Sequence, residues 1–245
     1  MVKRFLIAIM AVLAMTGVAE AKKKRVLPPV APPLAYAATP AVQPENVLVL
    51  QISTGGTVRI QLRPDIAPAH IERIKALTRA HFYDGILFHR VIEGFMAQTG
   101  DPKGTGEGGS PLPDLKAEFN GLPHMRGTVS MARTDAPDSA NSQFFICFQP
   151  VVKLDGKYTV FGRVLEGMQY VDLIERGEPP ANPARVVKAF IEADGPNAPR
   201  QVLAVPTEPA SRLEAAATIA DDAVTAPAAV APETKPKKKK KFLGF

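Results

Sequence analysis

Residues 82–101 combine one arginine and one glutamine with many large apolar side chains. Arg90 comes shortly before Phe95 and Met96, and Gln98 follows two residues after Met96. An arginine is almost never fully buried unless its hydrogen-bond donors are paired, so this mixture is unusual for a plain hydrophobic core. The stretch therefore predicts a functional site around Arg90. The alternative is a structural ion pair between Arg90 and a nearby carboxylate.

Other residues capable of chemistry do not form a recognisable pattern. The loop at 101–113 contains four glycines, but it runs into Pro-Leu-Pro, whereas a phosphate-binding loop leads into a helix. The single cysteine, Cys147, cannot form an intramolecular disulfide, and its apolar neighbours favour core packing over a reactive thiol. We expect no metal and no other cofactor, since no cysteine partners and no metal-ligand spacing accompany the histidines, which are His70, His81, His89 and His124.

The elements that must position Arg90 and Gln98 are mostly short and β-rich. Runs at 46–52 and 57–62 flank a Ser-Thr-Gly-Gly sequence, whose glycines supply the positive φ angles of a tight hairpin. Proline at the first helical position and apolar residues at helical spacing predict a helix over 68–80. Further strands are predicted at 86–92, 95–99, 128–132, 143–148, 159–165 and 186–192, and a second helix at 168–176.

About eight short strands with a helix near each end favour a mainly β domain. The specific prediction is a closed eight-stranded antiparallel β-barrel capped by two α-helices. Side chains fill the interior of a barrel of this size, so a ligand should bind on its outer wall.

The two ends of the chain differ from its middle in composition. Residues 1–21 have a basic start, an apolar run and an Ala-Glu-Ala sequence, which predict a cleavable signal peptide and a periplasmic protein. An uncleaved membrane anchor is the alternative, although the apolar run is short for a spanning helix. Residues 22–44 are predicted to be a Pro/Ala-rich linker, 45–195 the folded domain, and 196–245 a disordered Ala/Pro-rich tail with a Lys-rich end.

The formal charge of +6 arises from the ends of the chain. Residues 45–195 contain 16 Lys and Arg against 18 Asp and Glu, a balance of −2. A nucleic-acid-binding domain should carry its basic residues on the fold itself, so we expect no nucleic acid partner. The lysines at 235–241 and the apolar residues behind them suggest weak contact with an anionic membrane surface, and a solvated tail is the alternative.

Five motifs in order resemble the cyclophilins, and the Met-Ala-Arg-Thr form is similar to the bacterial exported branch. The resemblance covers almost all of 45–195 and leaves out both ends. The motifs are Phe-His-Arg-Val-Ile at 88–92, Gly-Phe-Met-Ala-Gln-Thr-Gly-Asp at 94–101, Met-Ala-Arg-Thr at 131–134, Ser-Gln-Phe-Phe-Ile at 142–146 and Val-Phe-Gly-Arg-Val at 160–164.

The resemblance implies peptidyl-prolyl cis/trans isomerase activity on proline-containing polypeptides, on an eight-stranded barrel with two capping helices. It places the catalytic arginine at Arg90, with Gln98 as its polar partner. Ordinary barrel core is the alternative for the apolar residues of the implied pocket. The substrate-binding residues that it implies are Phe95, Met96, Ala132, Arg133, Gln143, Phe145, Leu154 and Tyr158.

The chain departs from the family pattern at the rim of the implied pocket. Many members carry an aromatic residue, often Trp, just before Leu-Asp-Gly and a histidine shortly after it, where this chain has Lys153 and Tyr158. Because the arginine centre is intact, we expect activity to survive with an altered rim. The leading hypothesis is a monomeric exported foldase that assists protein folding in the periplasm, and its rival is a non-catalytic proline-peptide binding module or chaperone tethered by its basic tail.

The predicted signal peptide should be removed during export. The exported protein should begin after Ala21, because Ala19 and Ala21 provide the small side chains of a cleavage site. N-terminal sequencing of protein recovered from the periplasm measures this directly. An intact Met1 in the exported protein would contradict cleavage.

Overall fold

The computed structural model describes residues 39–205, and residues 1–38 and 206–245 lie outside this range. The predicted signal peptide and the Lys-rich end therefore lie outside the described residues, as do most of the predicted linker and tail. Contacts with the domain continue beyond the predicted boundary at 195. The backbone N–H of Gln201 donates to the Arg79 carbonyl at 2.9 Å, and Leu203 packs against the main hydrophobic core.

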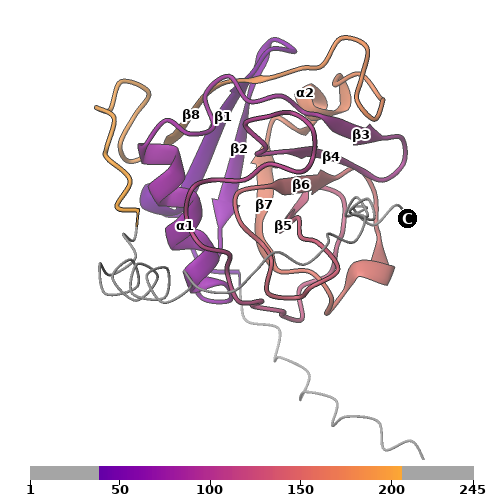
Figure 1. The fold of residues 1–245 in the computed structure, drawn as a ribbon, viewed down its shortest axis with the longest axis horizontal. Coiled ribbons are helices and arrows are strands. Elements are labelled where there is room, and N and C mark those ends of the chain that lie inside the picture. The colour runs from indigo at the N-terminus through magenta and orange to yellow at the C-terminus, as the bar shows by residue number, and fades with distance from the viewer. Residues whose placement is uncertain (1–38, 206–245) are drawn as a thin grey trace, which may run out of the picture. The chain divides into compact units, whose positions relative to one another are not determined.

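Eight strands within residues 39–205 form one antiparallel sheet in the order β3-β4-β6-β5-β7-β2-β1-β8 (Figure 1). In the same range, one short 3₁₀ helix precedes β1, and two α-helices and a second 3₁₀ helix lie between strands in sequence. The strands are β1 (Val47–Ile52), β2 (Gly56–Leu62), β3 (Arg90–Ile92), β4 (Met96–Thr99), β5 (Thr128–Met131), β6 (Phe144–Cys147), β7 (Val160–Glu166) and β8 (Val186–Ile191); the α-helices are α1 (Pro68–Arg79) and α2 (Met168–Asp172), and the 3₁₀ helices are Pro44–Asn46 and Val152–Leu154.

The sheet is a curled, open half-barrel, so the prediction of a closed barrel was wrong, while the mainly β class with two helices is confirmed. Strands β3 and β8 are the two edges of the sheet. Within residues 39–205, isolated bridges at Leu87↔Arg185 and Val91↔Gly177 link the segments beside these two edges, but β3 and β8 themselves do not pair. Closure would need a continuous ladder of hydrogen bonds, and β3 is only three residues long.

Two predicted elements are shorter than expected. The predicted strand at 86–92 is a strand only from Arg90, because the preceding residues cross toward the β8 side, where the Phe88 N–H donates to the Ala184 carbonyl at 2.8 Å. The predicted helix at 168–176 ends at Asp172, because the Arg176 guanidinium binds the Asp172 and Ile174 carbonyls. Side-chain donors there satisfy carbonyls that a longer helix would pair internally.

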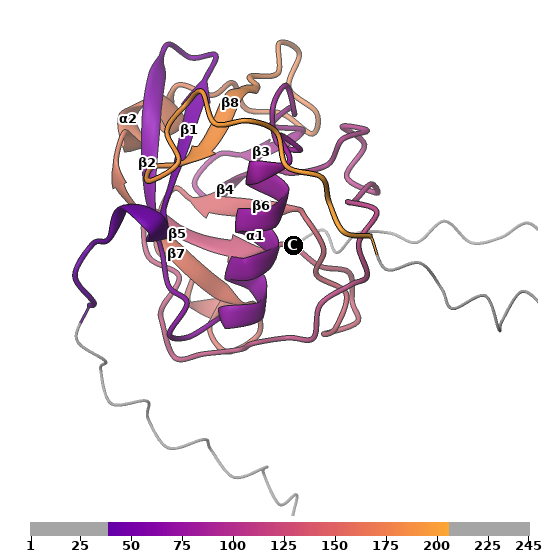
Figure 2. The ribbon, with the colours of Figure 1, turned by 90° about the vertical axis from the view of Figure 1, so that its left-hand side faces the viewer.

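The main core lies on the inner face of the sheet, where α1 covers it (Figure 2). Apolar residues at i, i+3 and i+6 of α1 turn toward this face, and they are Ile71, Ile74 and Leu77. They share one fully buried cluster with Ala97 of β4 and Ile146 of β6. The helix therefore fixes which face of β4 and β6 is interior.

A carboxylate from a distant loop caps the start of α1. The N-cap residue, Ala67, offers no side-chain acceptor. Glu118 instead accepts hydrogen bonds from the backbone N–H groups of Ala69 and His70, both at 3.1 Å, and contacts the His70 ring nitrogen Nδ1. This contact ties the loop before β5 to the helix that covers the core.

Replacing Glu118 by alanine should lower the free energy of unfolding by about 1–2 kcal/mol, since two N–H groups of α1 and a buried imidazole lose their acceptor. Urea unfolding followed by circular dichroism measures the loss. Glu166→Ala is the matched control, because the Glu166 side chain is 66% exposed and its ion pair with Arg59 should contribute about 0.5 kcal/mol. Equal losses in both variants would contradict the capping role.

Candidate functional site

The register of four neighbouring strands places the predicted catalytic residues in one row. Arg90 of β3 pairs with Gln98 of β4, Gln98 with Phe145 of β6, and Phe145 with Ser130 of β5. Directly paired residues in adjacent strands project from the same face of a sheet. The row therefore lies on the face opposite to the main core, which is also the side where the sequence predicts ligand binding.

A second buried cluster forms the apolar part of this face. Of the predicted pocket residues, Met96, Phe145 and Leu154 are almost fully buried in it, and Phe95 packs against it while remaining partly exposed. Tyr158 closes one side with its ring edge-on to Phe145, at 5.8 Å between ring centroids. The structure thus brings together residues that lie up to 63 positions apart in sequence, from Phe95 to Tyr158.

Arg90 lies at the edge of this cluster with a carboxylate partner. Its side chain is 20% exposed, and its Nε donates to Glu178 Oε2 at 2.8 Å. The structural ion pair that was the alternative to a functional site is therefore present, although the sequence did not identify Glu178 as the partner of Arg90. The pair occupies the Nε edge of the guanidinium, and a guanidinium carries four further N–H donors on its two Nη atoms.

Gln98 and Gln143 form a buried chain of amides that ends in the glycine-rich loop. Gln98 Nε2 donates to Gln143 Oε1 at 2.8 Å. Gln143 Nε2 in turn donates to the carbonyls of Gly106 and Gly108, at 2.9 and 2.7 Å. Because each buried amide has a partner, the orientation of the Gln98 side chain is fixed from outside the sheet.

Asp101 holds the glycine-rich loop in place. Its carboxylate accepts the backbone N–H groups of Lys103, Thr105 and Gly106. Burial alone would raise the pKa of Asp101, but these N–H donors outweigh burial and hold it below its ordinary value. A Cβ at Gly108 would lie 1.9 Å from Asp101 Oδ1, so only glycine fits there. The loop's donors are thus directed at Asp101, and its carbonyls are directed at Gln143.

Sequence reasoning missed two polar residues beneath Phe145. The His124 ring stacks on Phe145 with 6.1 Å between centroids. His124 Nδ1 lies 2.8 Å from Asp155 Oδ1, and Nε2 lies 3.1 Å from Ser130 Oγ. Alternation along β5 could have placed Ser130 on the face of the site, opposite the core residue Val129, but no local pattern marks His124.

Two cations lie over aromatic rings at the rim. The Arg133 guanidinium carbon is 4.6 Å from the centre of the Tyr158 ring, and Arg133 also donates to the carbonyls of Thr134 and Lys157. Lys153 Nζ lies 5.6 Å from the centre of the Phe95 ring. The two positions where the sequence departs from the family pattern, Lys153 and Tyr158, therefore both contribute to the rim through cation–π contacts.

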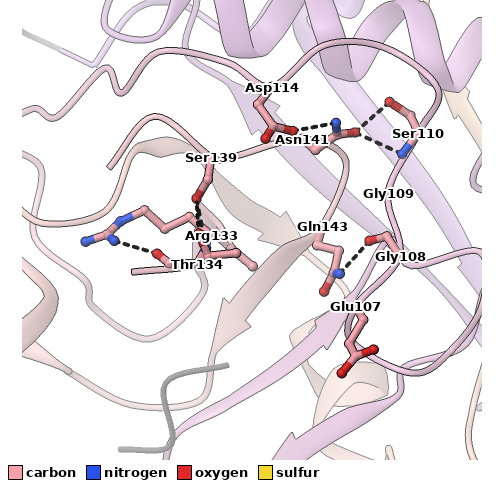
Figure 3. A pocket seen from close by; sticks show the side chains of 11 residues that line it. Glu107, Gly108, Gly109, Ser110, Asp114, Arg133, Thr134, Ser139, Asn141 and Gln143 are labelled. Atoms are coloured by element: carbon pink, nitrogen blue, oxygen red, sulfur yellow. Dashed lines mark hydrogen bonds between the residues drawn. The ribbon is translucent and has the colours of Figure 1, made fainter. Parts of the chain in front are cut away.

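A pocket of about 250 Å³ adjoins the apolar cluster (Figure 3). Asn141 braces one wall by accepting hydrogen bonds from Ser110 and donating to Asp114, and Thr134 braces another through Ser139. The predicted substrate-binding residues Ala132, Arg133 and Gln143 belong to its lining, which comprises Glu107, Gly108, Gly109, Ser110, Asp114, Ala132, Arg133, Thr134, Ser139, Asn141 and Gln143.

Comparison with known proteins identifies the family. The family described as "Cyclophilin type peptidyl-prolyl cis-trans isomerase/CLD" matches residues 48–191. The chain belongs to this cyclophilin family. A probable peptidyl-prolyl cis-trans isomerase of Brucella suis is 49% identical over 170 residues, which cover 63% of this chain and 86% of the relative. Peptidyl-prolyl cis-trans isomerase-like 3 of Gallus gallus is 43% identical over 125 residues, covering 49% and 77%.

Solved cyclophilin structures have the same fold. Cyclophilin AquaCyp293 from Hirschia baltica is 32% identical, with a TM-score of 0.59 over 63% of this chain and 76% of that one. A Cryptosporidium parvum cyclophilin-type isomerase, crystallised in the presence of the dipeptide Ala-Pro, is 26% identical, with a TM-score of 0.56 over 59% of this chain and 98% of that one.

Cys147 of this cyclophilin lies within the second buried cluster, next to Met96 in register. Burial raises the pKa of its thiol to about 12, so the thiol stays protonated at neutral pH. Within residues 39–205, no group of three or more His, Cys, Asp or Glu side chains is arranged to hold a metal ion. None of the helices described in that range has the length and apolar character needed to cross a membrane.

Buried histidines should make the stability of this cyclophilin pH-dependent. Burial lowers the pKa of His124, although contact with Asp155 opposes the shift, and burial likewise lowers the pKa values of His70 and His89. The folded state therefore favours neutral rings, whereas the unfolded chain takes up protons near its ordinary pKa of about 6.5. Stability should be full above this pH and fall as the pH drops through it.

We expect His124→Gln to reduce this pH dependence, because one fewer proton is taken up on unfolding. The slope of the unfolding free energy between about pH 7.5 and 5.5 should decrease by up to about 1.4 kcal/mol per pH unit. Urea unfolding at several pH values measures the slope for both proteins. Identical slopes would contradict a neutral buried His124.

Proposed function

We propose that this cyclophilin isomerises X-Pro peptide bonds in polypeptides, with Arg90 as the catalytic donor. The observation that carries the proposal is the cross-strand row Arg90–Gln98–Phe145, which sets a charged donor beside the buried apolar cluster. The matching family supports the reaction, and its C. parvum member crystallised with Ala-Pro supports proline-containing peptides as ligands.

The reaction needs no bond to break. Rotation about a peptide bond faces a barrier of about 18–20 kcal/mol because amide resonance is lost on the way. In the twisted transition state the proline nitrogen regains a lone pair, and a donor directed at it stabilises that state more than either planar form. The Nη groups of Arg90 suit this role because a guanidinium stays protonated at all physiological pH values.

The pocket must contribute as well as the arginine. A rate gain of about a hundred-thousandfold corresponds to roughly 7 kcal/mol, and one charged hydrogen bond contributes about 1.5–3 kcal/mol. The remainder is assigned to the apolar side chains, which would hold the proline ring while the preceding carbonyl rotates. Phe145, Met96 and Leu154 are each at most 4% exposed, so packing already fixes their positions before a peptide binds.

The wider role that we propose is assistance of protein folding in the cell envelope. Its support is the signal-like sequence at 1–21 together with the balance of −2 over residues 45–195, which does not favour nucleic acid. The proposal includes a monomer and weak contact between the Lys-rich end and anionic lipid headgroups.

A non-catalytic module that binds proline-containing segments is the second candidate. The observation that favours it is the Arg90–Glu178 ion pair, which already occupies one edge of the guanidinium. In such a module the pocket would hold the proline ring, and the arginine would serve only the fold.

Arg90→Ala should reduce kcat/KM for an Ala-Pro peptide by about 100-fold or more, because the transition state loses its charged donor. Arg90→Lys should recover little of the activity lost in Arg90→Ala, since the lysine ammonium lacks the planar set of N–H donors of a guanidinium. NMR exchange spectroscopy measures both without a coupled protease. Arg79→Ala, which changes an arginine on α1 paired with Asp194, is the control and should keep wild-type activity.

Two results would contradict this proposal in different ways. Full activity in Arg90→Ala would remove the arginine from the mechanism but leave an isomerase. An inactive wild-type protein that still binds the peptide would favour the binding module.

A further inference from the structure

In the segment before β8, a backbone bridge places the Glu178 carboxylate next to the catalytic row. Val91 and Gly177 exchange two backbone hydrogen bonds, each 2.8 Å long. Because Arg90 and Glu178 are the immediate neighbours of these bridged residues, the bridge sets the two side chains next to each other, 88 positions apart in sequence. The contact is thus built by the fold and does not depend on chance proximity of two flexible side chains.

The backbone of this segment has little freedom to move Glu178 away. Pro179 and Pro180 follow Glu178 directly, and proline rings fix their own φ angles. A Cβ at Gly177 would lie 2.5 Å from the Cα of Pro180, so the turn folds back closely on itself. Glu178 therefore projects from a stiff turn, although its own side chain is 53% exposed.

A second ion pair, between Arg176 and Glu93, links the same two segments on the other side of the Val91–Gly177 bridge. Arg176 Nε donates to Glu93 Oε2 at 2.7 Å, and the Arg176 guanidinium carbon lies 4.3 Å from the centre of the Phe148 ring. The pairs Arg90–Glu178 and Glu93–Arg176 therefore flank the bridge with the same chemistry and similar Nε–Oε2 distances. Only the first includes a residue of the catalytic row, so the second is a natural comparison.

Arginine has several rotatable bonds, and a guanidinium without a partner would spread over many orientations. With Nε held at 2.8 Å by Glu178, the plane of the guanidinium is restrained and its Nη groups stay available. The carboxylate also offsets part of the positive charge, but water screens a pair in which one member is half exposed. Orientation is therefore the larger effect.

We propose that Glu178 is a positioning residue that holds the Arg90 guanidinium in the orientation needed to reach the proline nitrogen. The proposal rests on the proposed isomerase function, and it assigns to the turn before β8 a role in catalysis. Glu178 acts through Arg90 and need not touch the peptide. Its effect should therefore appear in turnover more than in substrate binding.

The test compares Glu178→Ala and Glu178→Gln with Glu93→Ala in the full chain, by NMR exchange on an Ala-Pro peptide. Glu178→Ala should lower kcat about tenfold with KM changed less than about twofold, because a loosely oriented donor is productive less often. Glu178→Gln keeps an oxygen acceptor for Nε, so it should restore kcat to within about threefold of wild type. Glu93→Ala should retain wild-type kcat.

A second readout follows the pair itself. In ¹H–¹⁵N spectra the Arg90 Nε–H resonance, assigned by its absence in Arg90→Lys, should be shifted and slow to exchange in the wild type and in Glu178→Gln. It should move toward the free-arginine position in Glu178→Ala. This readout needs no catalytic activity, so it remains informative if the wild-type protein proves inactive.

Three outcomes would overturn the inference. Wild-type or higher kcat in Glu178→Ala would mean that the carboxylate does not position the arginine. If Arg90→Ala still loses activity, the proposed isomerase mechanism would stand and only the role of Glu178 would be refuted. Equal losses in Glu178→Ala and Glu93→Ala would indicate general loosening of the turn. An Arg90 Nε–H resonance unchanged by Glu178→Ala would show that the pair does not restrain Arg90 in solution.

Discussion

The strict alternation of side chains along β4 and β6 is the constraint on which both the core and the site depend. Ala97 and Ile146 enter the main core beneath α1, whereas the residues beside them in sequence, Met96 and Phe145, line the site. A shift of register by one residue would exchange the two sets. The packing of the core therefore also determines which side chains of β4 and β6 reach the site.

Polar contacts then attach irregular segments to this regular frame. The Gln98–Gln143 amide pair reaches from the sheet to the glycine-rich loop, which Asp101 holds in shape. On the opposite edge, the Val91–Gly177 bridge carries Glu178 to Arg90. In both places a buried or half-buried polar group gains a partner from a distant loop, which satisfies its hydrogen bonds and also limits its motion.

Local patterns predicted most of the elements, but contacts between distant segments decided the rest. The hairpin, α1 and the inner strands follow from glycine, proline and apolar spacing, and the family motifs named the pocket residues that the structure gathers around Phe145. The prediction of a closed barrel failed because strand count does not reveal whether the edges β3 and β8 meet. The places of His124 and Glu178 at the site were not predicted for a related reason, since each contacts a partner that no local pattern identifies.

The burial of Cys147 has a practical consequence for experiments on this chain. It is the only cysteine in the sequence, and its thiol is fully shielded and stays protonated at neutral pH. Maleimide dyes and spin labels react with exposed thiolates, so the native protein should resist them while folded. A cysteine introduced at a chosen surface position would thus be the one attachment point, and a probe placed beside the pocket could report the arrival of a peptide without any change to the native sulfur.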